Sequence, residues 1–226
     1  GAHLAAEFRA REAGVIAGMD AARLALRLLD ADVTLQIERG DGATVAPNDC
    51  IATIAGSARS ILMAERTMLN FMGHLSGIAT LTRRYVEAVS GTRARITCTR
   101  KTTPGLRALE KRAVRLGGAT NHRYSLADAI LIKDNHIAAA GSIGRAVAAA
   151  RAAAPHVARV EVEAGSLAQV RAAVTAGAEV ILLDNLTPTQ VAAAVRLIAG
   201  RARVEVSGGI TLGNIREYAL PGVDVI

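Results

Sequence analysis

The order of hydrophobic and polar residues gives the chain two different rhythms. In its first part, the alternating patterns of LAAEFRARE (4–12) and VTLQIE (33–38) predict strands, and a further strand is expected at the end of 40–56. Between them, AGMDAARLALRLLD (17–30) has the spacing of an amphipathic helix. Together these elements predict a small α/β layer with open edges.

A single long helical pattern follows, from residue 59 to residue 89. Its apolar residues recur at intervals of three and four, as at Ile61 and Met68. We expect Gly73 and the Ser76-Gly77 pair to break the helix or to allow a close helix contact. This helix is predicted to link the small layer to a second, larger domain.

After Gly91 the pattern changes to a repeat of strand, loop and helix. The predicted strands are 94–98, 129–132, 159–164, 179–185, 203–209 and 223–226. The predicted helices are 142–154, 166–177, 187–200 and 211–220, with expected caps at Ser142, Ser166, Thr187 before Pro188, and Thr211. The spacing of the last four strands is typical of βα repeats, in either a parallel barrel or a doubly wound sheet.

Composition narrows the choice of partner. The formal net charge is +7, which favours an anionic partner, while aromatic residues make up only 2% of the chain. Nucleic-acid binders usually combine basic charge with stacking aromatics, so small anions are favoured over nucleic acid. Cys50 and Cys98 lie far apart without a CxxC motif, and the chain has no long uncharged apolar run. We therefore expect a cytoplasmic protein that binds no nucleic acid and no membrane.

Much of the positive charge lies in one stretch, from Thr99 to Lys133. Part of this stretch, 106–116, is predicted to be a helix with one apolar face. Arg107 and Arg115 are expected on the other side of that helix, facing solvent. The other cations lie at a strand end or in loops, where side chains can converge on a pocket; they are Arg100, Lys101, His122, Arg123 and Lys133. Converging cations repel one another unless an anion with several negative groups lies among them, such as a dicarboxylate beside a phosphorylated sugar.

Polar residues also follow the predicted parallel strands at their carboxyl ends, where βα barrels build their active sites. Glu163 and Asp184 end two of these strands, and such acids could hold ribose hydroxyls or Mg²⁺. Ser207, Gly208 and Gly209 form a glycine turn that is expected to open a helix and to offer backbone N–H groups to a phosphate.

Six segments together carry a family resemblance. They are AERTMLNFMGHLSGIAT, TRKTTPGLRALEKRAVRLGGATNHR, LADAILIKDNH, VEVEAGSLAQ, VILLDN and VEVSGGI. In order and spacing they resemble the quinolinate phosphoribosyltransferase family, also called nicotinate-nucleotide pyrophosphorylase (carboxylating). A sister group linked to molybdenum transport shares the ERT and TRKT regions but lacks the NHR and IKDNH forms.

The resemblance implies a fold, an activity and an assembly. The fold would be a small N-terminal α/β sandwich domain (1–58), linking helices (59–90) and an incomplete parallel α/β barrel (91–226) of the type II phosphoribosyltransferase kind. The activity would be that of a decarboxylating pentosyltransferase, which makes nicotinate mononucleotide, pyrophosphate and CO₂ from quinolinate and phosphoribosyl pyrophosphate, with Mg²⁺, in NAD biosynthesis. The assembly would be a homodimer with shared active sites, with a hexamer as the alternative.

The resemblance also implies roles for individual residues. Arg100, His122, Arg123 and Lys133 would bind the two quinolinate carboxylates, and Lys101 would reach both substrates. Arg66 would be lent by the neighbouring subunit. Glu163 and Asp184 would lie near the ribose and the metal, and Ser207, Gly208 and Gly209 would form part of the 5′-phosphate cradle. We expect the chain to be cut from a longer protein. That protein would contain a further phosphate-binding loop, which activity requires.

Two other function classes stay open at this point. A module that binds nucleic acid or another polyanion could use the same basic stretch, although the scarcity of aromatics and the acids at strand ends argue against it. A different phosphate-binding barrel enzyme is the third interpretation, but a single phosphate would not need so many cations.

Overall fold

The computed structural model describes every residue from 1 to 226, and the chain folds into two compact units. Unit 1 comprises Gly1–Val86 with Lys101–Asn121, and unit 2 comprises Glu87–Arg100 with His122–Ile226. Each unit buries hydrophobic residues of its own. The predicted domain segments 1–58, 59–90 and 91–226 stay a prediction.

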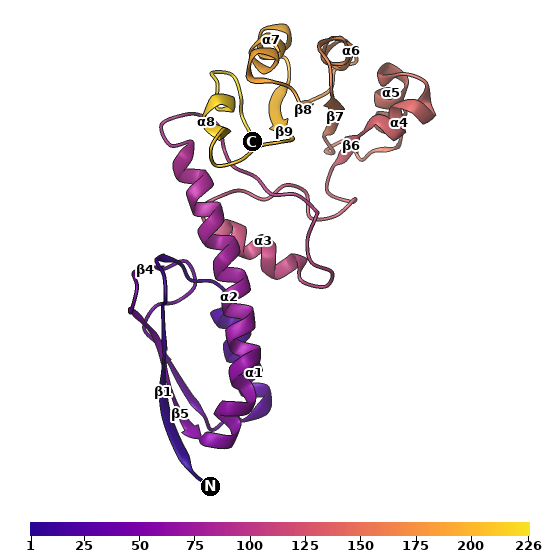
Figure 1. The fold of residues 1–226 in the computed structure, drawn as a ribbon. Helices are drawn as coiled ribbons and strands as arrows, with labels where there is room; N and C mark the ends of the chain where they lie inside the picture. Colours follow the sequence, from indigo (N-terminus) through magenta and orange to yellow (C-terminus); the bar gives the residue numbers. More distant parts are fainter. The chain divides into compact units, whose positions relative to one another are not determined.

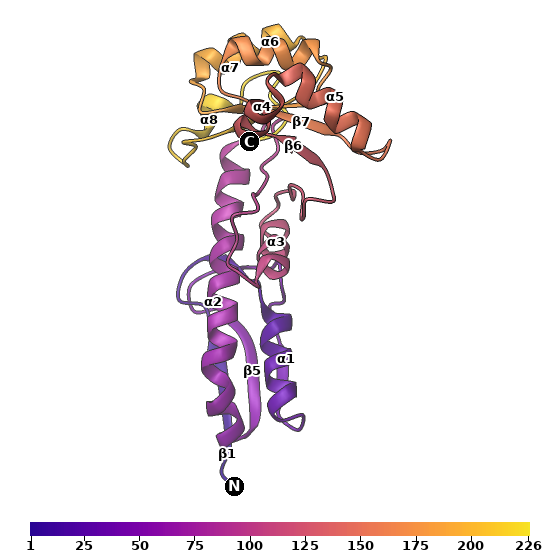
Figure 2. The same cartoon turned by 90° about the vertical axis from the view of Figure 1, so that its right-hand side faces the viewer.

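Unit 1 contains a three-stranded antiparallel sheet in the order β1-β5-β3 (Figure 1). These strands are β1 (His3–Arg9), β3 (Thr34–Ile37) and β5 (Cys50–Ser57), and a second small sheet pairs β2 (Gly14–Val15) with β4 (Thr44–Val45). The strands predicted in the first part of the chain are confirmed, with bounds that differ by up to three residues. Helices α1 (Met19–Leu29) and α2 (Ala58–Ala88) lie along this sheet (Figure 2).

The core of unit 1 forms between these helices and the sheet. Leu26 from α1, Ile54 from β5 and Met68 from α2 belong to the same buried cluster. The buried residues of α2 recur every three or four positions, which is the spacing that places them on one helix face. Although α2 has 31 residues, neither it nor any other helix is long and apolar enough to cross a membrane.

The expected break in the long helix is wrong, because α2 runs without interruption. A side chain added at Gly73 or Gly77 would meet no atom within 4 Å, so neither glycine makes a close contact. The contact at this place comes from Ser76, whose hydroxyl accepts from Ala17 N at 2.9 Å and donates to Ala17 O at 3.1 Å. Tertiary packing of α2 therefore overrides the weak helix propensity of glycine.

Helix α3 (Arg107–Leu116) also belongs to unit 1 and differs from its prediction on the polar side. Arg115 is exposed as expected. Glu110 and Lys111, however, are buried, and Arg107 is half-buried and donates from Nε to Thr102 Oγ1 at 3.1 Å. The charged side of this helix is thus partly enclosed by the loop that precedes it.

Unit 2 contains a four-stranded parallel sheet in the order β6-β7-β8-β9. The strands are β6 (Ile130–Ile132), β7 (Val160–Ala164), β8 (Val180–Asp184) and β9 (Arg203–Ser207). Helices α5 (Ile143–Ala153), α6 (Leu167–Thr175) and α7 (Pro188–Ile198) connect them and cover one face of the sheet (Figures 1 and 2). The short helix α4 (Asp134–Ala140) follows β6.

Three of the four predicted helix caps are confirmed in unit 2. The hydroxyls of Ser142, Ser166 and Thr187 each accept a backbone N–H three residues later, and Pro188 is the first residue of α7. The cap at Thr211 is wrong, because α8 (Ile215–Tyr218) begins four residues later, with Asn214 as its N-cap.

The segments 94–98 and 223–226 are not regular strands as predicted. They meet through an isolated parallel bridge of Arg95 with Val225, and a second such bridge joins Val225 to Glu205 of β9. Thr97 N donates to Ile226 O at 2.9 Å, and Val206 N donates to Val225 O at 2.9 Å. The parallel arrangement therefore continues past β9, although the pairing is too short to form strands.

Candidate functional site

The two faces of the sheet in unit 2 differ sharply in polarity. On the face covered by helices, β7 presents Val160, Val162 and Ala164, all fully buried. Since side chains alternate along a strand, Glu161 and Glu163 point to the opposite face. The register aligns Glu163 with Leu182 of β8 and Leu182 with Glu205 of β9, so these side chains share that face.

The same alternation places most of the polar strand residues on this second face. It carries Lys133 after β6, Glu161 and Glu163 on β7, Asp184 on β8, and Glu205 and Ser207 on β9. We call this the acid-lined face. It is where the sheet of unit 2 can meet a polar ligand.

His122 lies directly against two buried acids of this face. Its Nε2 is 3.2 Å from Glu161 Oε2 and 3.6 Å from Glu205 Oε1. Glu161 and Glu205 are only 5% and 8% exposed, and the loop that carries His122 comes from a distant part of the chain. The three residues form a buried imidazole–dicarboxylate cluster, which we call the His122 cluster.

The surroundings of the His122 cluster raise the pKa of both His122 and Glu205. A hydrogen bond to Glu161 raises the pKa of His122 above its ordinary value, against the opposing effect of burial. Burial and the nearby charge of Glu161 raise the pKa of Glu205 to about 7. The contact with Glu161 therefore favours the charged form of His122, and near neutral pH Glu205 binds a proton part of the time.

Arg123, the next residue, lies close to a second guanidinium. Burial and the charge of Arg100 hold the pKa of Arg123 below its ordinary value, while Glu161 and Asp128 oppose this effect. Its Nη1 donates to Ala129 O at 3.0 Å, which ties the side chain to the loop before β6. Two guanidinium groups held this closely favour binding of an anion between or beside them.

Lys133 and Glu163 join the carboxyl ends of two neighbouring strands. Lys133 Nζ is 3.0 Å from Glu163 Oε2, with the lysine side chain about half exposed and the glutamate side chain 20% exposed. The pair can therefore exchange its mutual contact for contacts to a ligand without a large change in burial. Lys133 and Glu163 were predicted as site residues on separate grounds, and the structure brings them into contact.

The turns that follow β8 and β9 pack closely against each other. Asn185 N donates to Ser207 O at 2.9 Å, and Asn185 Nδ2 donates to Asp184 Oδ2 at 2.7 Å. Gly208 has φ +95°, and a Cβ there would lie 2.2 Å from Asn185 Oδ1. Only glycine fits this position, because the backbone is left-handed and the neighbouring turn occupies the space of a side chain.

The expectation that this glycine turn opens a helix is wrong. Helix α8 begins only at Ile215, six residues after Gly209, and has four residues. Instead, Asn214 Nδ2 donates to Gly209 O at 3.0 Å and Asn214 Oδ1 accepts from Thr211 N at 2.7 Å. Any phosphate cradle here must use the backbone of the turn itself.

Two of the predicted site residues, Arg66 and Lys101, belong to unit 1. Lys101 is exposed and begins the loop that Glu110 fixes, since Glu110 Oε2 accepts from Thr103 N at 3.2 Å and its Oε1 lies 2.8 Å from His74 Nε2. Arg66 is exposed on α2. The functional roles of both residues stay predictions.

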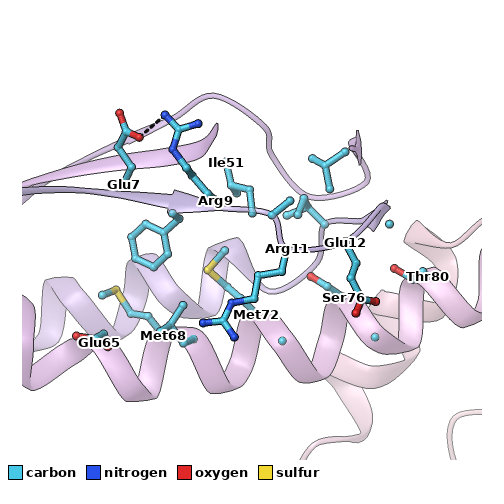
Figure 3. Close-up of a pocket in the computed structure, with 18 of the residues that line it drawn as sticks. Glu7, Arg9, Arg11, Glu12, Ile51, Glu65, Met68, Met72, Ser76 and Thr80 are labelled. Carbon is cyan, nitrogen blue, oxygen red and sulfur yellow. Dashed lines mark ion pairs between the residues drawn. The ribbon is translucent and has the colours of Figure 1, made fainter. Parts of the chain in front are cut away.

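Arg66 lines a groove of about 930 Å³ between β1, the following turn and α2. Figure 3 shows Met68, Met72 and Ser76 on the helix, with Arg11 and Glu12 reaching toward it from the segment after β1, while Arg9 points away from the helix and pairs with Glu7. On the same helix, Leu62 and Met63 are each more than half exposed. An apolar surface of this kind is typical of a protein–protein contact.

Comparison with known proteins agrees with this architecture and with the sequence motifs. The family model described as "Quinolinate phosphoribosyl transferase, N-terminal domain" matches residues 1–76, and the model of the C-terminal domain matches residues 78–226. The chain belongs to the quinolinate phosphoribosyl transferase family. The resemblance stated from the motifs is thereby confirmed.

Individual relatives extend over nearly the whole chain. A protein of Mycobacterium leprae named nicotinate-nucleotide pyrophosphorylase [carboxylating] is 48% identical over 96% of this chain and 78% of its own length. A probable enzyme of the same name from Synechocystis sp. is 46% identical over 98% of this chain and 76% of its own length.

Solved structures of the family share the fold. NadC from Streptococcus pyogenes superimposes with a TM-score of 0.94 at 47% identity, covering 99% of this chain and 79% of that one. The nicotinate-nucleotide pyrophosphorylase from Francisella tularensis gives a TM-score of 0.94 at 39% identity, over 99% of this chain and 80% of that one. The predicted fold class, a small N-terminal α/β domain with an incomplete parallel α/β barrel, is confirmed.

Glu161 and Glu205 are not among the predicted site residues, although the sequence carries a signal for both. In VEVEA and VEV, an acid stands at every second position of a strand that is otherwise apolar. A buried parallel strand normally reads as a continuous apolar run, so an alternating acid indicates that one face meets polar groups. Only Glu163, at the strand end, was recognised.

Proposed function

We propose that this protein transfers the phosphoribosyl group of phosphoribosyl pyrophosphate to quinolinate, with loss of one carboxylate as CO₂. The products are nicotinate mononucleotide and pyrophosphate, in the biosynthesis of NAD. The names of its relatives support this activity. The observation that supports it most directly is the gathering of His122, Arg123, Arg100 and Lys133 around the acid-lined face of unit 2.

Binding of quinolinate follows from charge. The substrate is a doubly charged pyridine, and Arg100, His122, Arg123 and Lys133 offer it cationic donors from three separate segments. Guanidinium groups bind carboxylates with two parallel hydrogen bonds, while lysine and histidine supply charge at single points. Burial lowers the pKa of Arg123 most, and the charge of Arg100 lowers it further. The repulsion between these two guanidinium groups is relieved when a dianion binds.

Transfer then depends on positioning and charge. The cationic site orients the ring nitrogen of quinolinate toward C1 of the ribose, with Lys101 reaching toward both substrates. As pyrophosphate leaves, C1 becomes oxocarbenium-like, and the carboxylate of Glu163 or Asp184 stabilises it electrostatically. The ribosylated ring nitrogen is positively charged, so the ring accepts the electron pair released when the adjacent carboxylate leaves as CO₂.

The residues present fit Mg²⁺. Glu163 and Asp184 end neighbouring strands on the same face, and they offer the hard carboxylate oxygens that Mg²⁺ prefers. Mg²⁺ usually binds through one or two carboxylates together with substrate phosphates, which matches this pair and the diphosphate of the substrate. When bound, the ion supplies positive charge to the pyrophosphate group.

We also propose a homodimer in which Arg66 completes the site of the neighbouring subunit; assembly into a hexamer is the alternative. Arg66 lines the apolar groove of unit 1, and a second copy of this chain would cover the exposed Leu62 and Met63 beside it. A cytoplasmic location fits Cys50 and Cys98, which are both free thiols.

A direct assay tests the activity. The full-length protein is incubated with quinolinate, phosphoribosyl pyrophosphate and Mg²⁺, and the products are separated by HPLC and identified by mass spectrometry. We expect nicotinate mononucleotide with one CO₂ released per turnover, and no product when nicotinate replaces quinolinate. A folded protein that forms no nicotinate mononucleotide would refute the proposed function.

A further inference from the structure

Glu161 and Glu205 have no role in the reaction as proposed above, yet they lie against one of its binding residues. The carboxylates come from β7 and β9, which are separated by β8, and approach His122 Nε2 at 3.2 Å and 3.6 Å. One potential ligand atom from each of the three residues lies within 4.8 Å of the others. The ring is therefore held from two strands at once.

Packing alone does not explain why acids occupy these positions. Burying a carboxylate is costly unless it is paired and hydrogen-bonded. Glu161 Oε1 is buried without a hydrogen-bond partner, and Glu205 is buried beside another acid. Leu182, which aligns with Glu205 on the same face, is the kind of residue that would serve stability better. Two buried acids at a binding site therefore indicate a function.

The two acids can control the protonation state of the His122 imidazole. A neutral histidine whose Nε2–H donates to a carboxylate must carry a lone pair on Nδ1. A lone pair repels the carboxylate of a substrate, whereas an imidazolium has a donor on both nitrogens. To bind an anion, His122 must therefore keep its second proton even though the site is partly buried.

The charged groups around His122 decide whether it keeps that proton. Glu161 from β7 and Glu205 from β9 favour the charged ring, and Arg123 from its own loop opposes it. Glu161 also favours the charged form of Arg123, which is next to Arg100. Glu161 thus supports both cations of the NHR motif, and Glu205 supports His122.

We propose that Glu161 and Glu205 are positioning residues for quinolinate, which hold His122 on the acid-lined face as a doubly protonated donor to a substrate carboxylate. This proposal rests on the proposed function. Glu161 is the principal partner because its oxygen is closer to Nε2. Glu205, which binds a proton itself near neutral pH, contributes more as the pH rises.

Steady-state kinetics of E161Q and E205Q in the full-length protein test the proposal. Glutamine keeps the shape and can still accept from Nε2–H, so these variants remove mainly charge. We expect E161Q to raise KM for quinolinate about tenfold to a hundredfold, by analogy with the loss of a carboxylate that supports a metal-binding histidine. KM for phosphoribosyl pyrophosphate should change by less than about threefold, which is well below the change expected for quinolinate. E205Q should have a smaller effect that grows from pH 6.5 to pH 8.

E179Q is the matched control. Glu179 is also an ion-paired glutamate beside this sheet, bound to Arg151 at 2.7 Å and to Val160 N at 2.9 Å, but it precedes β8 at the opposite end. This variant should leave both KM values at the wild-type level. If E161Q raises both KM values equally, or leaves KM for quinolinate unchanged, the positioning role is overturned.

Histidine NMR provides a readout that does not depend on turnover. The chain has five histidines, and an H122N variant assigns the ring signals of His122. In the wild type we expect both ring nitrogens of His122 to be protonated at pH 7, and in E161Q the ring should titrate at least about one unit lower. A wild-type ring that is neutral at pH 7 overturns the proposal, even if E161Q does not fold.

The two failures are distinguishable. If the wild type makes no nicotinate mononucleotide, the proposed function fails and no KM exists for either substrate. If the wild type is active but NMR shows that the pKa of His122 is that of an ordinary histidine, the proposed function stands and the positioning role fails.

Discussion

Lys133 Nζ lies 3.0 Å from Glu163 Oε2, so a predicted quinolinate-binding cation is paired with a predicted ribose- or metal-binding acid. The two residues end neighbouring parallel strands, and they meet because side chains at equivalent heights of β6 and β7 share a face. The predicted binding sites of the two substrates would therefore lie next to each other.

Replacing Lys133 by alanine should weaken quinolinate binding far more than phosphoribosyl pyrophosphate binding. A lost charge-assisted hydrogen bond is worth about 1.5–3 kcal/mol, which corresponds to a loss of roughly tenfold or more in affinity. Isothermal titration calorimetry of each ligand measures the two effects. Arg196→Ala, which removes one exposed cation from α7, is the control and should change neither affinity. Equal losses for both ligands in K133A would contradict the assignment.

The raised pKa of Glu205 should make folding stability depend on pH. Its pKa is raised from 4.5 to about 7 in the folded protein, so the folded state binds a proton that the unfolded state has released at intermediate pH. Stability from this group is present below pH 4.5 and is lost as the pH rises to 7, by at most about 3 kcal/mol.

Urea unfolding of the wild type and of E205Q at several pH values checks this linkage. The variant should gain stability relative to the wild type as the pH rises from 4.5 to 7, because glutamine has no proton to lose. If the difference between the two proteins is constant over that range, the carboxyl of Glu205 does not titrate as described.

Gly208→Ala should damage the turn that ends β9. The new Cβ would lie 2.2 Å from Asn185 Oδ1 and 2.9 Å from Asn185 N, at a residue with φ +95°. We expect a loss of about 1–3 kcal/mol in stability, together with weaker binding of phosphoribosyl pyrophosphate.

Thermal unfolding and calorimetry measure both effects of the Gly208 change. Gly144→Ala serves as the control, because Gly144 lies inside α5 and a Cβ there meets no atom within 4 Å. That substitution should stabilise the protein by about 0.5–1 kcal/mol. A Gly208→Ala protein with wild-type stability and affinity would show that the turn has room to move.

Mixing two inactive variants tests whether subunits share an active site. Arg66→Ala and Lys133→Ala should each abolish most activity, but a heterodimer of the two has one site with both residues intact. We expect about half of the wild-type activity in the pure heterodimer, because one of its two sites is intact, and about a quarter in a randomly mixed sample, in which about half of the dimers are mixed. Activity is measured after purification of the heterodimer with two affinity tags. No recovery in that heterodimer argues against the role of Arg66.

The sequence by itself determined the local elements and much of the chemistry. The caps at Ser142, Ser166 and Thr187 were predictable because each depends on a side chain and a backbone N–H three residues apart. Glu163 and Asp184 could be placed at strand ends for the same reason, since strand length and direction follow from the apolar pattern.

Only the tertiary structure decided which charged residues are buried and which side chains meet. Glu110 and Lys111 belong to the polar part of a helical pattern, yet both are buried, because the packing of a loop against α3 is not encoded within the helix. Glu161, Glu205 and His122 come together from three segments through the register of the parallel sheet. Periodicity shows which side of a strand a residue occupies, but long-range pairing determines what lies on that side.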